Sequence, residues 1–243
     1  MSTDKTEITT DTAPEKKVIL TEKRVQVIVA VLLGLTALLT AWATWIGSLH
    51  GGIQSINFTK STKLSSEGTA TFNSTMQVFI SDMMVWNTAS DYKLKAKVER
   101  MDGNKKEAKL YEEKAETFIK ENGSDYLIGA IKKMDDNTKS PFEVKGVYKM
   151  YFKDSENYFK QSDEHLMEGK RDNAKGDAYN LVNVIYSLIL FLLGIVNVFK
   201  DLFSKKLILG IAVFGLVVAT IYMITIPLPT GFNLFNYIGF VAK

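Results

Sequence analysis

Hydrophobic side chains gather in three long, uninterrupted windows of the chain, residues 25–46, 179–199 and 207–226. None of these windows contains Asp, Glu, Lys, Arg or His. An α-helix rises about 1.5 Å per residue, so about 20 residues span the roughly 30 Å hydrocarbon core of a bilayer. The pattern therefore predicts an integral membrane protein whose transmembrane helices cover residues 23–48, 179–200 and 207–226.

The segment between the first two spans, residues 49–178, has a different pattern. One stripe of mostly apolar residues, spaced three and four apart, consists of Phe72, Met76, Phe79, Met83, Trp86, Ser90 and Leu94. A second stripe runs from Val144 to Leu166 and has a charged opposite face. An amphipathic helix must bury its apolar face, so we expect the two stripes to pack antiparallel. This predicts an all-α extramembrane domain, either a coiled-coil stalk or a small helical bundle.

Local signals divide this domain further. Asp102-Gly103-Asn104 is typical of a turn, and helices are expected over residues 105–121 and 125–134. Ser140, Pro141 and Glu143 form a capping-box pattern, which predicts that the last domain helix begins there. Near the membrane, Gly51-Gly52 allow a bend after the first span, and residues 167–178 interrupt the apolar face and are expected to cross the headgroup zone.

The remaining segments are short. Residues 1–22 are rich in Thr, Asp, Glu and Lys, which favours a disordered tail. Residues 201–206 form a short basic loop between the last two spans. Residues 227–243 carry no charge before Lys243 and are too short to span a bilayer, so we expect an interfacial segment, or one that packs against the spans.

Basic residues near the spans predict the topology. Lys16, Lys17, Lys23 and Arg24 precede the first span, and Lys200, Lys205 and Lys206 lie between the second and third. Cytoplasmic loops are enriched in such residues, so the N-terminus should be cytoplasmic and the helical domain extracytoplasmic. Ala41-Trp42-Ala43 matches a signal-peptidase site, but the apolar run continues beyond it, which favours an uncleaved span.

The composition mainly indicates which functions are not expected. The chain has 243 residues, 46% of them hydrophobic, a net charge of +3 and no cysteine. Residues 47–178 hold 21 basic and 21 acidic side chains, so no basic excess points to nucleic acid. We therefore expect no nucleic-acid partner and no thiol chemistry.

The region from Asn173 to Leu228 carries Gly176-Asp177 before Tyr179, Phe191-Leu192 with Gly194-Ile195, a short basic loop, and a last span ending at Pro227. In these features and in its layout it resembles small bacterial three-span membrane proteins of unknown function. The resemblance covers about a quarter of the chain. It implies an architecture and brings no activity or functional residue with it.

The second span has a polar face made of Asn180, Asn183, Ser187, Gly194 and Asn197, with Leu190 among them. Amides are costly against lipid, so this face should meet protein or water. It could pack within one subunit, form a subunit interface or line a pore. Small residues on the other spans, Thr40, Thr44, Gly215 and Ala219, are candidates for close helix packing, and mutual packing of the three spans is the simplest expectation.

The sequence contains few residue patterns typical of an enzyme active site. His50 lies at a membrane boundary, and His165 lies beside Glu164 and Glu168 on a charged helix, which is a weak metal-site pattern. There is no Gly-rich phosphate loop and no nucleophile elbow. The aromatic face with Tyr148, Tyr151, Tyr158 and Phe159 is more typical of a core than of a ligand pocket. We therefore expect no enzyme and no cofactor.

These observations favour a multi-pass cell-membrane protein whose helical domain mediates assembly or partner contact. The expected partners are the lipid bilayer and either further copies of the chain or another membrane protein. The alternative is a small oligomeric channel or membrane-permeabilising effector, with Asn180, Asn183, Ser187 and Asn197 lining its pore.

Overall fold

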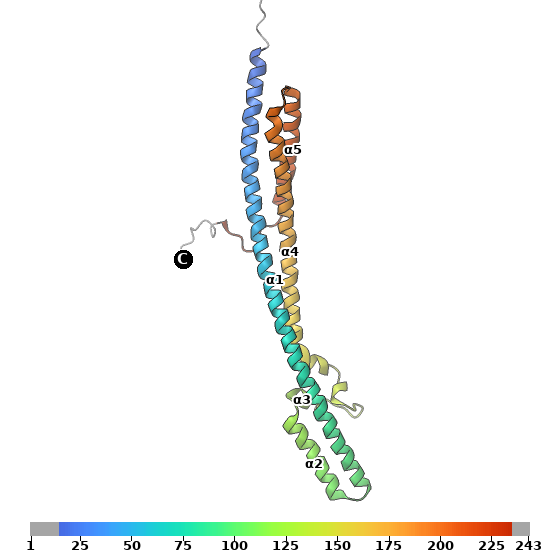
Figure 1. Cartoon of the computed structure of the whole chain (residues 1–243). Coiled ribbons are helices and arrows are strands. Elements are labelled where there is room, and N and C mark those ends of the chain that lie inside the picture. The colour runs from blue at the N-terminus through green and yellow to red at the C-terminus, as the bar shows by residue number, and fades with distance from the viewer. Residues whose placement is uncertain (1–14, 235–243) are drawn as a thin grey trace, which may run out of the picture. The chain divides into compact units, whose positions relative to one another are not determined.

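The computed structural model describes residues 15–234, with side chains from Glu22 onward. Within this range the chain is helical and has no strand. The helices, shown in Figure 1, are α1 (Glu15–Met101), α2 (Lys105–Asn122), α3 (Asp125–Ile131), η1 (Pro141–Glu143), α4 (Val147–Ile195), η2 (Val196–Val198) and α5 (Leu202–Thr225). The predicted all-α class is confirmed for this range.

The chain divides into two compact units. The terminal unit comprises Met1–Ile56 and Glu168–Lys243, and the central unit comprises Asn57–Met167. Because α1 and α4 are long, each contributes residues to both units.

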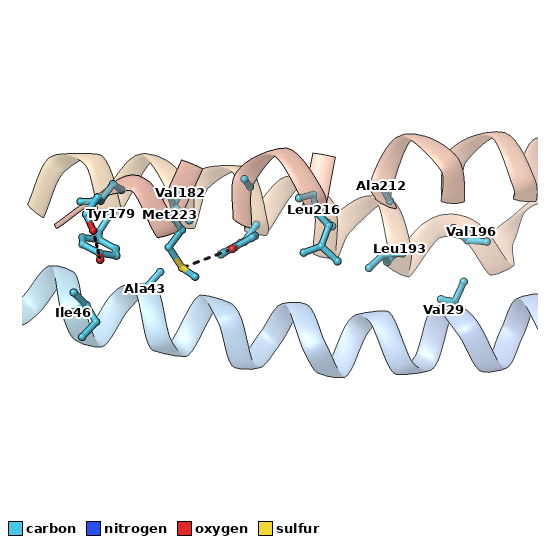
Figure 2. Close-up of a cluster of buried hydrophobic side chains, with 14 of the residues drawn as sticks. Val29, Ala43, Ile46, Tyr179, Val182, Leu193, Val196, Ala212, Leu216 and Met223 are labelled. Carbon is cyan, nitrogen blue, oxygen red and sulfur yellow. Dashed lines mark hydrogen bonds between the residues drawn. The ribbon is translucent and has the colours of Figure 1, made fainter. Parts of the chain in front are cut away.

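In the terminal unit, α1, α4 and α5 lie side by side (Figure 1). Each of the three contains a stretch long and apolar enough to cross a membrane. Figure 2 shows the side chains that fill the space among them, including Val29, Val182 and Leu216. The three predicted hydrophobic windows therefore fall on helices of spanning length, and these helices bury one another's apolar faces.

The central unit confirms the antiparallel pairing of the two stripes. Phe72 contacts Phe152 with ring centroids 4.9 Å apart, and Phe79 contacts Tyr151 at 5.0 Å. Further along, Ser61 Oγ lies 3.1 Å from Ser162 Oγ. The residue numbers of contacting partners decrease on α4 as they increase on α1, as an antiparallel pair requires.

Beyond this region α1 pairs with α2 instead of α4. Tyr92 stacks on Tyr111 with centroids 6.5 Å apart, and Arg100 Nη2 lies 2.6 Å from Glu112 Oε1. The positions buried on α1 here are Asp82, Val85, Ala89 and Ala96, whereas Leu94 is 62% exposed. The buried face of α1 therefore differs from the predicted stripe over its second half. The stripe was chosen by large apolar side chains, so it omitted the small alanines and the aspartate that are buried here.

Both long helices continue through glycine-containing segments next to the apolar windows. Helix α1 continues through Gly51-Gly52, and α4 continues through residues 167–178. A glycine in a helix interior costs about 1 kcal/mol relative to alanine, which neighbouring packing readily outweighs. The short helix ends at Ile131 rather than Met134.

The capping pattern at Ser140 marks a different element. Ser140 Oγ accepts from the Phe142 amide at 3.4 Å, but Pro141–Glu143 form only a 3₁₀ turn. Gly146 then takes φ of 84°, and α4 begins at Val147. The left-handed backbone at Gly146 separates the cap from the helix, so the predicted start was too early.

At the N-terminal end, helix α1 begins at Glu15, within the segment for which a tail is expected. The first 14 residues of that segment lie outside the described range. After α5, Phe232 packs edge-on against Trp42 and Trp45, with centroids 6.2 Å and 5.7 Å away. The segment from Ile226 to Leu234, called the C-terminal segment below, thus contacts α1.

Candidate functional site

The polar face of α4 lies outside the core of the terminal unit. Asn180, Ser187 and Gly194 on α4 and Asn197 on η2 are exposed, and Asn183 is half-buried. The side that packs against α1 and α5 carries Tyr179, Val182, Tyr186, Ile189 and Leu193 on α4 and Val196 on η2, several of which appear in Figure 2. The five polar-face residues therefore lie beside the helix interface rather than within it.

Asn183 is the inner member of this face. Its Oδ1 is buried and has no hydrogen-bond partner among the described residues. Ser187 Oγ donates to the Asn183 carbonyl at 2.8 Å and is thereby satisfied within α4. The amide groups of the face, unlike its hydroxyl, are not satisfied by the local helix backbone.

The predicted close-packing residues behave in two ways. Thr40 Oγ1 donates to the Thr36 carbonyl and Thr44 Oγ1 to the Thr40 carbonyl, both at 2.8 Å, so neither hydroxyl links two helices in these bonds. Ala219 is fully buried, and a Cβ added to Gly215 would lie 3.5 Å from the Ile189 side chain. The small pair on α5 therefore allows close contact with α4.

A buried contact between a histidine and an aspartate in the terminal unit was missed from the sequence. His50 on α1 is fully buried, and its Nδ1 lies 2.9 Å from Asp172 Oδ1 on α4. His50 Nε2 lies 3.1 Å from the Pro227 carbonyl, and Lys175 Nζ lies 3.6 Å from the same Asp172 oxygen. One imidazole thus joins α1, α4 and the C-terminal segment.

Helical spacing could have located this pair. His50 continues the buried positions Ala43 and Ile46, at intervals of three and four. On α4, Asp172 precedes Gly176 and Tyr179 at intervals of four and three. Extending each apolar stripe one turn past the end of its span would have placed both residues on the helix interface.

The central unit contains a second buried carboxylate, Asp82 on α1. Its Oδ1 accepts from the Ser124 amide at 2.9 Å, and its Oδ2 accepts from Ser124 Oγ at 2.5 Å and from Tyr151 Oη at 2.7 Å. Burial, together with the neighbouring Asp82 carboxylate, raises the pKa of Tyr151 well above the ordinary tyrosine value. This cluster fastens the N-terminus of α3 and the start of α4 to α1.

Only some of the other candidates from the sequence are buried, and Tyr148 of the aromatic face is 52% exposed. His165 Nδ1 lies 3.1 Å from Asn57 Oδ1, and no group of three or more metal-ligating side chains occurs in the described part of the chain. Tyr151 is buried in the core of the central unit. Tyr158 instead lines an open groove of about 490 Å³ with Thr71, Asp154, Asn157 and Gln161.

Comparisons with known proteins give no relative: no family model, curated protein or solved structure matches this chain.

Proposed function

We propose that this protein is a non-enzymatic, multi-pass membrane protein that assembles through the polar face of α4. The observation that carries the proposal is the exposure of Asn180 and Ser187 on α4, a helix otherwise suited to lipid, and of Asn197 on η2 directly after it. A three-helix unit that buried its amides internally would need no partner, whereas this one presents them outward.

The free energy of the polar face depends on what covers it in the bilayer. An amide left against hydrocarbon loses its hydrogen bonds to water, which costs several kcal/mol. Contact with the same face of another copy lets amides pair across the interface, at about 0.6–2 kcal/mol for each hydrogen bond. Gly194, which has no neighbouring atom within 4 Å of a built Cβ, lets the second helix approach closely.

The central unit supplies a second surface for contact, in the aqueous phase. Leu94, Val98 and Met101 on α1, and Leu110 on α2, are between 49% and 80% exposed. Apolar side chains grouped on an exposed surface are typical of protein interfaces. We propose that this helical hairpin is where the extramembrane domain meets a partner.

For orientation, we propose a cytoplasmic N-terminus and an extracytoplasmic central unit. Lys23 and Arg24 on α1 are exposed, and Lys205 Nζ on α5 pairs with Glu22 Oε1 at 3.1 Å. This pair brings the basic ends of two apolar helices together. Cytoplasmic segments of membrane proteins are enriched in Lys and Arg, so this basic end is expected on the cytoplasmic side.

Cysteine crosslinking in native membranes tests the assembly. The chain has no cysteine, so each introduced thiol is the sole thiol in its protein. Asn180→Cys and Asn197→Cys should give covalent dimers. The matched controls Leu181→Cys and Leu188→Cys, which are 51% and 59% exposed on another side of α4, should not. Absence of dimers at the amide positions, or equal dimers at all four positions, would contradict the proposal.

The second candidate is an oligomeric channel, favoured by the uncharged amides and hydroxyl that follow one another along a single face of α4. Such a face can line a narrow aqueous pore when several copies surround it. Reconstitution into liposomes decides this. Conductance should appear and should fall when Asn180 and Asn183 become leucine, whereas Leu181→Ala should leave it unchanged. If the liposomes show no conductance, the channel is excluded and assembly remains as the proposed function.

A further inference from the structure

The hydrogen bonds around His50 place acceptors on both sides of its ring. The Pro227 carbonyl can only accept, and the ionised Asp172 carboxylate can only accept. Lys175 Nζ, 3.6 Å from Asp172 Oδ1, favours the ionised carboxylate. Both ring nitrogens must therefore donate, and an imidazole with two N–H groups carries a positive charge.

We propose that His50 is a pH-sensitive clasp that holds the C-terminal segment against α1 and α4. When the imidazole loses a proton, one nitrogen becomes an acceptor and faces another acceptor. The remaining N–H stays with Asp172, because a hydrogen bond to a carboxylate is about twice as strong as one to a neutral acceptor. The contact between His50 Nε2 and the Pro227 carbonyl is then lost.

The surroundings contain little else that titrates. Asp172 and Tyr179 on α4 face the imidazole, with Lys175 beyond Asp172; the Tyr179 ring lies 5.9 Å from that of His50. His50 is the only ionisable residue between Val25 and Thr59 on α1, and residues 207–234 contain no Asp, Glu, Lys, Arg or His. The protonation state of His50 therefore controls the charge at this contact.

The C-terminal segment makes further contacts with α4 and α1. Tyr179 Oη donates to the Ile226 carbonyl at 3.4 Å, and Phe232 rests on the two tryptophans of α1. The clasped form holds one more proton than the released form, so a rise in pH favours release. Under the orientation proposed above, His50 lies on α1 at the extracytoplasmic end of the first apolar window, residues 25–46, and responds to external pH.

Distances between two spin labels test the clasp in the full chain in lipid nanodiscs. Labels at Ser48→Cys and Thr230→Cys, both exposed positions, report the separation of α1 and the C-terminal segment. We expect one narrow distance distribution at about pH 5 and a longer, broader one at about pH 9. The ratio of the two populations should change about tenfold per pH unit, as a one-proton step requires.

The chain has two histidines, His50 and His165, so a variant of His165 is the matched control. His165→Gln should keep the pH dependence, and His50→Gln should abolish it. A distribution that does not change between these pH values, or an unchanged transition in His50→Gln, would overturn the proposal.

A second measurement does not require a His50 variant to fold. In His165→Gln protein the imidazole of His50 is the only one present, so ¹⁵N spectra of labelled histidine report its protonation directly. We expect both ring nitrogens to carry protons while the labels show the clasped distance. A neutral ring in the clasped form would overturn the proposal.

Discussion

Asp82 in the central unit and Asp172 in the terminal unit are both buried carboxylates, but different kinds of group stabilise them. Asp82 is held by an amide and two hydroxyls, none of which carries a charge. Asp172 is held by an imidazole and an ammonium group. The first arrangement contains only uncharged donors, whereas the second includes the histidine proposed above as a clasp. The same side chain thus serves a fixed junction in one unit and a releasable one in the other.

The largest effect is expected from Asp82→Ala. It leaves the buried Tyr151 hydroxyl and the half-buried Ser124 amide without their acceptor, and each unsatisfied group costs about 1–3 kcal/mol. We expect the free energy of unfolding to fall by about 4 kcal/mol. Hydrogen exchange of the full chain in detergent should show the loss of protection in the central unit.

The matched control for this variant is Asp91→Ala, an exposed aspartate on the same helix. It should change the free energy of unfolding by less than about 0.5 kcal/mol. Equal losses in the two variants would show that Asp82 does not fasten α3 and α4.

Asp172→Ala should have a smaller effect, about 2 kcal/mol, in the terminal unit. The loss is limited because His50 can release its proton and Lys175, at 29% exposure, can reach water. Asp177→Ala, at an exposed position one turn further along α4, is its control. Hydrogen exchange that changed first in the central unit would contradict this assignment.

Tyr151→Phe removes one of three donors to Asp82 and should cost about 1 kcal/mol at neutral pH. The raised pKa of Tyr151 gives this site a pH dependence. The folded phenol keeps its proton while the unfolded one loses it above about pH 10, so stability from this group is present below that pH and declines above it. Unfolding midpoints of wild type and variant should therefore converge between about pH 9 and pH 11; a constant difference would contradict the prediction.

The smallest effect is expected from Glu22→Gln. It removes the charge that faces Lys205, but the glutamate side chain is 37% exposed and solvent screens the pair. We expect a loss of about 0.5 kcal/mol in thermal unfolding, decreasing as salt is added. A loss comparable to that of Asp172→Ala would show that this end of the terminal unit is as dry as the region around His50.

Local pattern was sufficient for the helical class, the three apolar helices and the aromatic core of the central unit. The windows at residues 25–46, 179–199 and 207–226 follow from composition alone, because helix rise and bilayer thickness are fixed lengths. The pairing of Phe72 and Phe79 with α4 follows from two apolar stripes that each need a partner.

The tertiary structure decided which polar residues are buried and which are left outside. Asn180 and Asp172 both lie on α4, yet the amide is exposed and the carboxylate is enclosed. That difference depends on how α4 is rotated against α1 and α5, which residues far apart in the chain determine together. Spacing along one helix groups residues into faces, but only the neighbouring helices select the face that is buried.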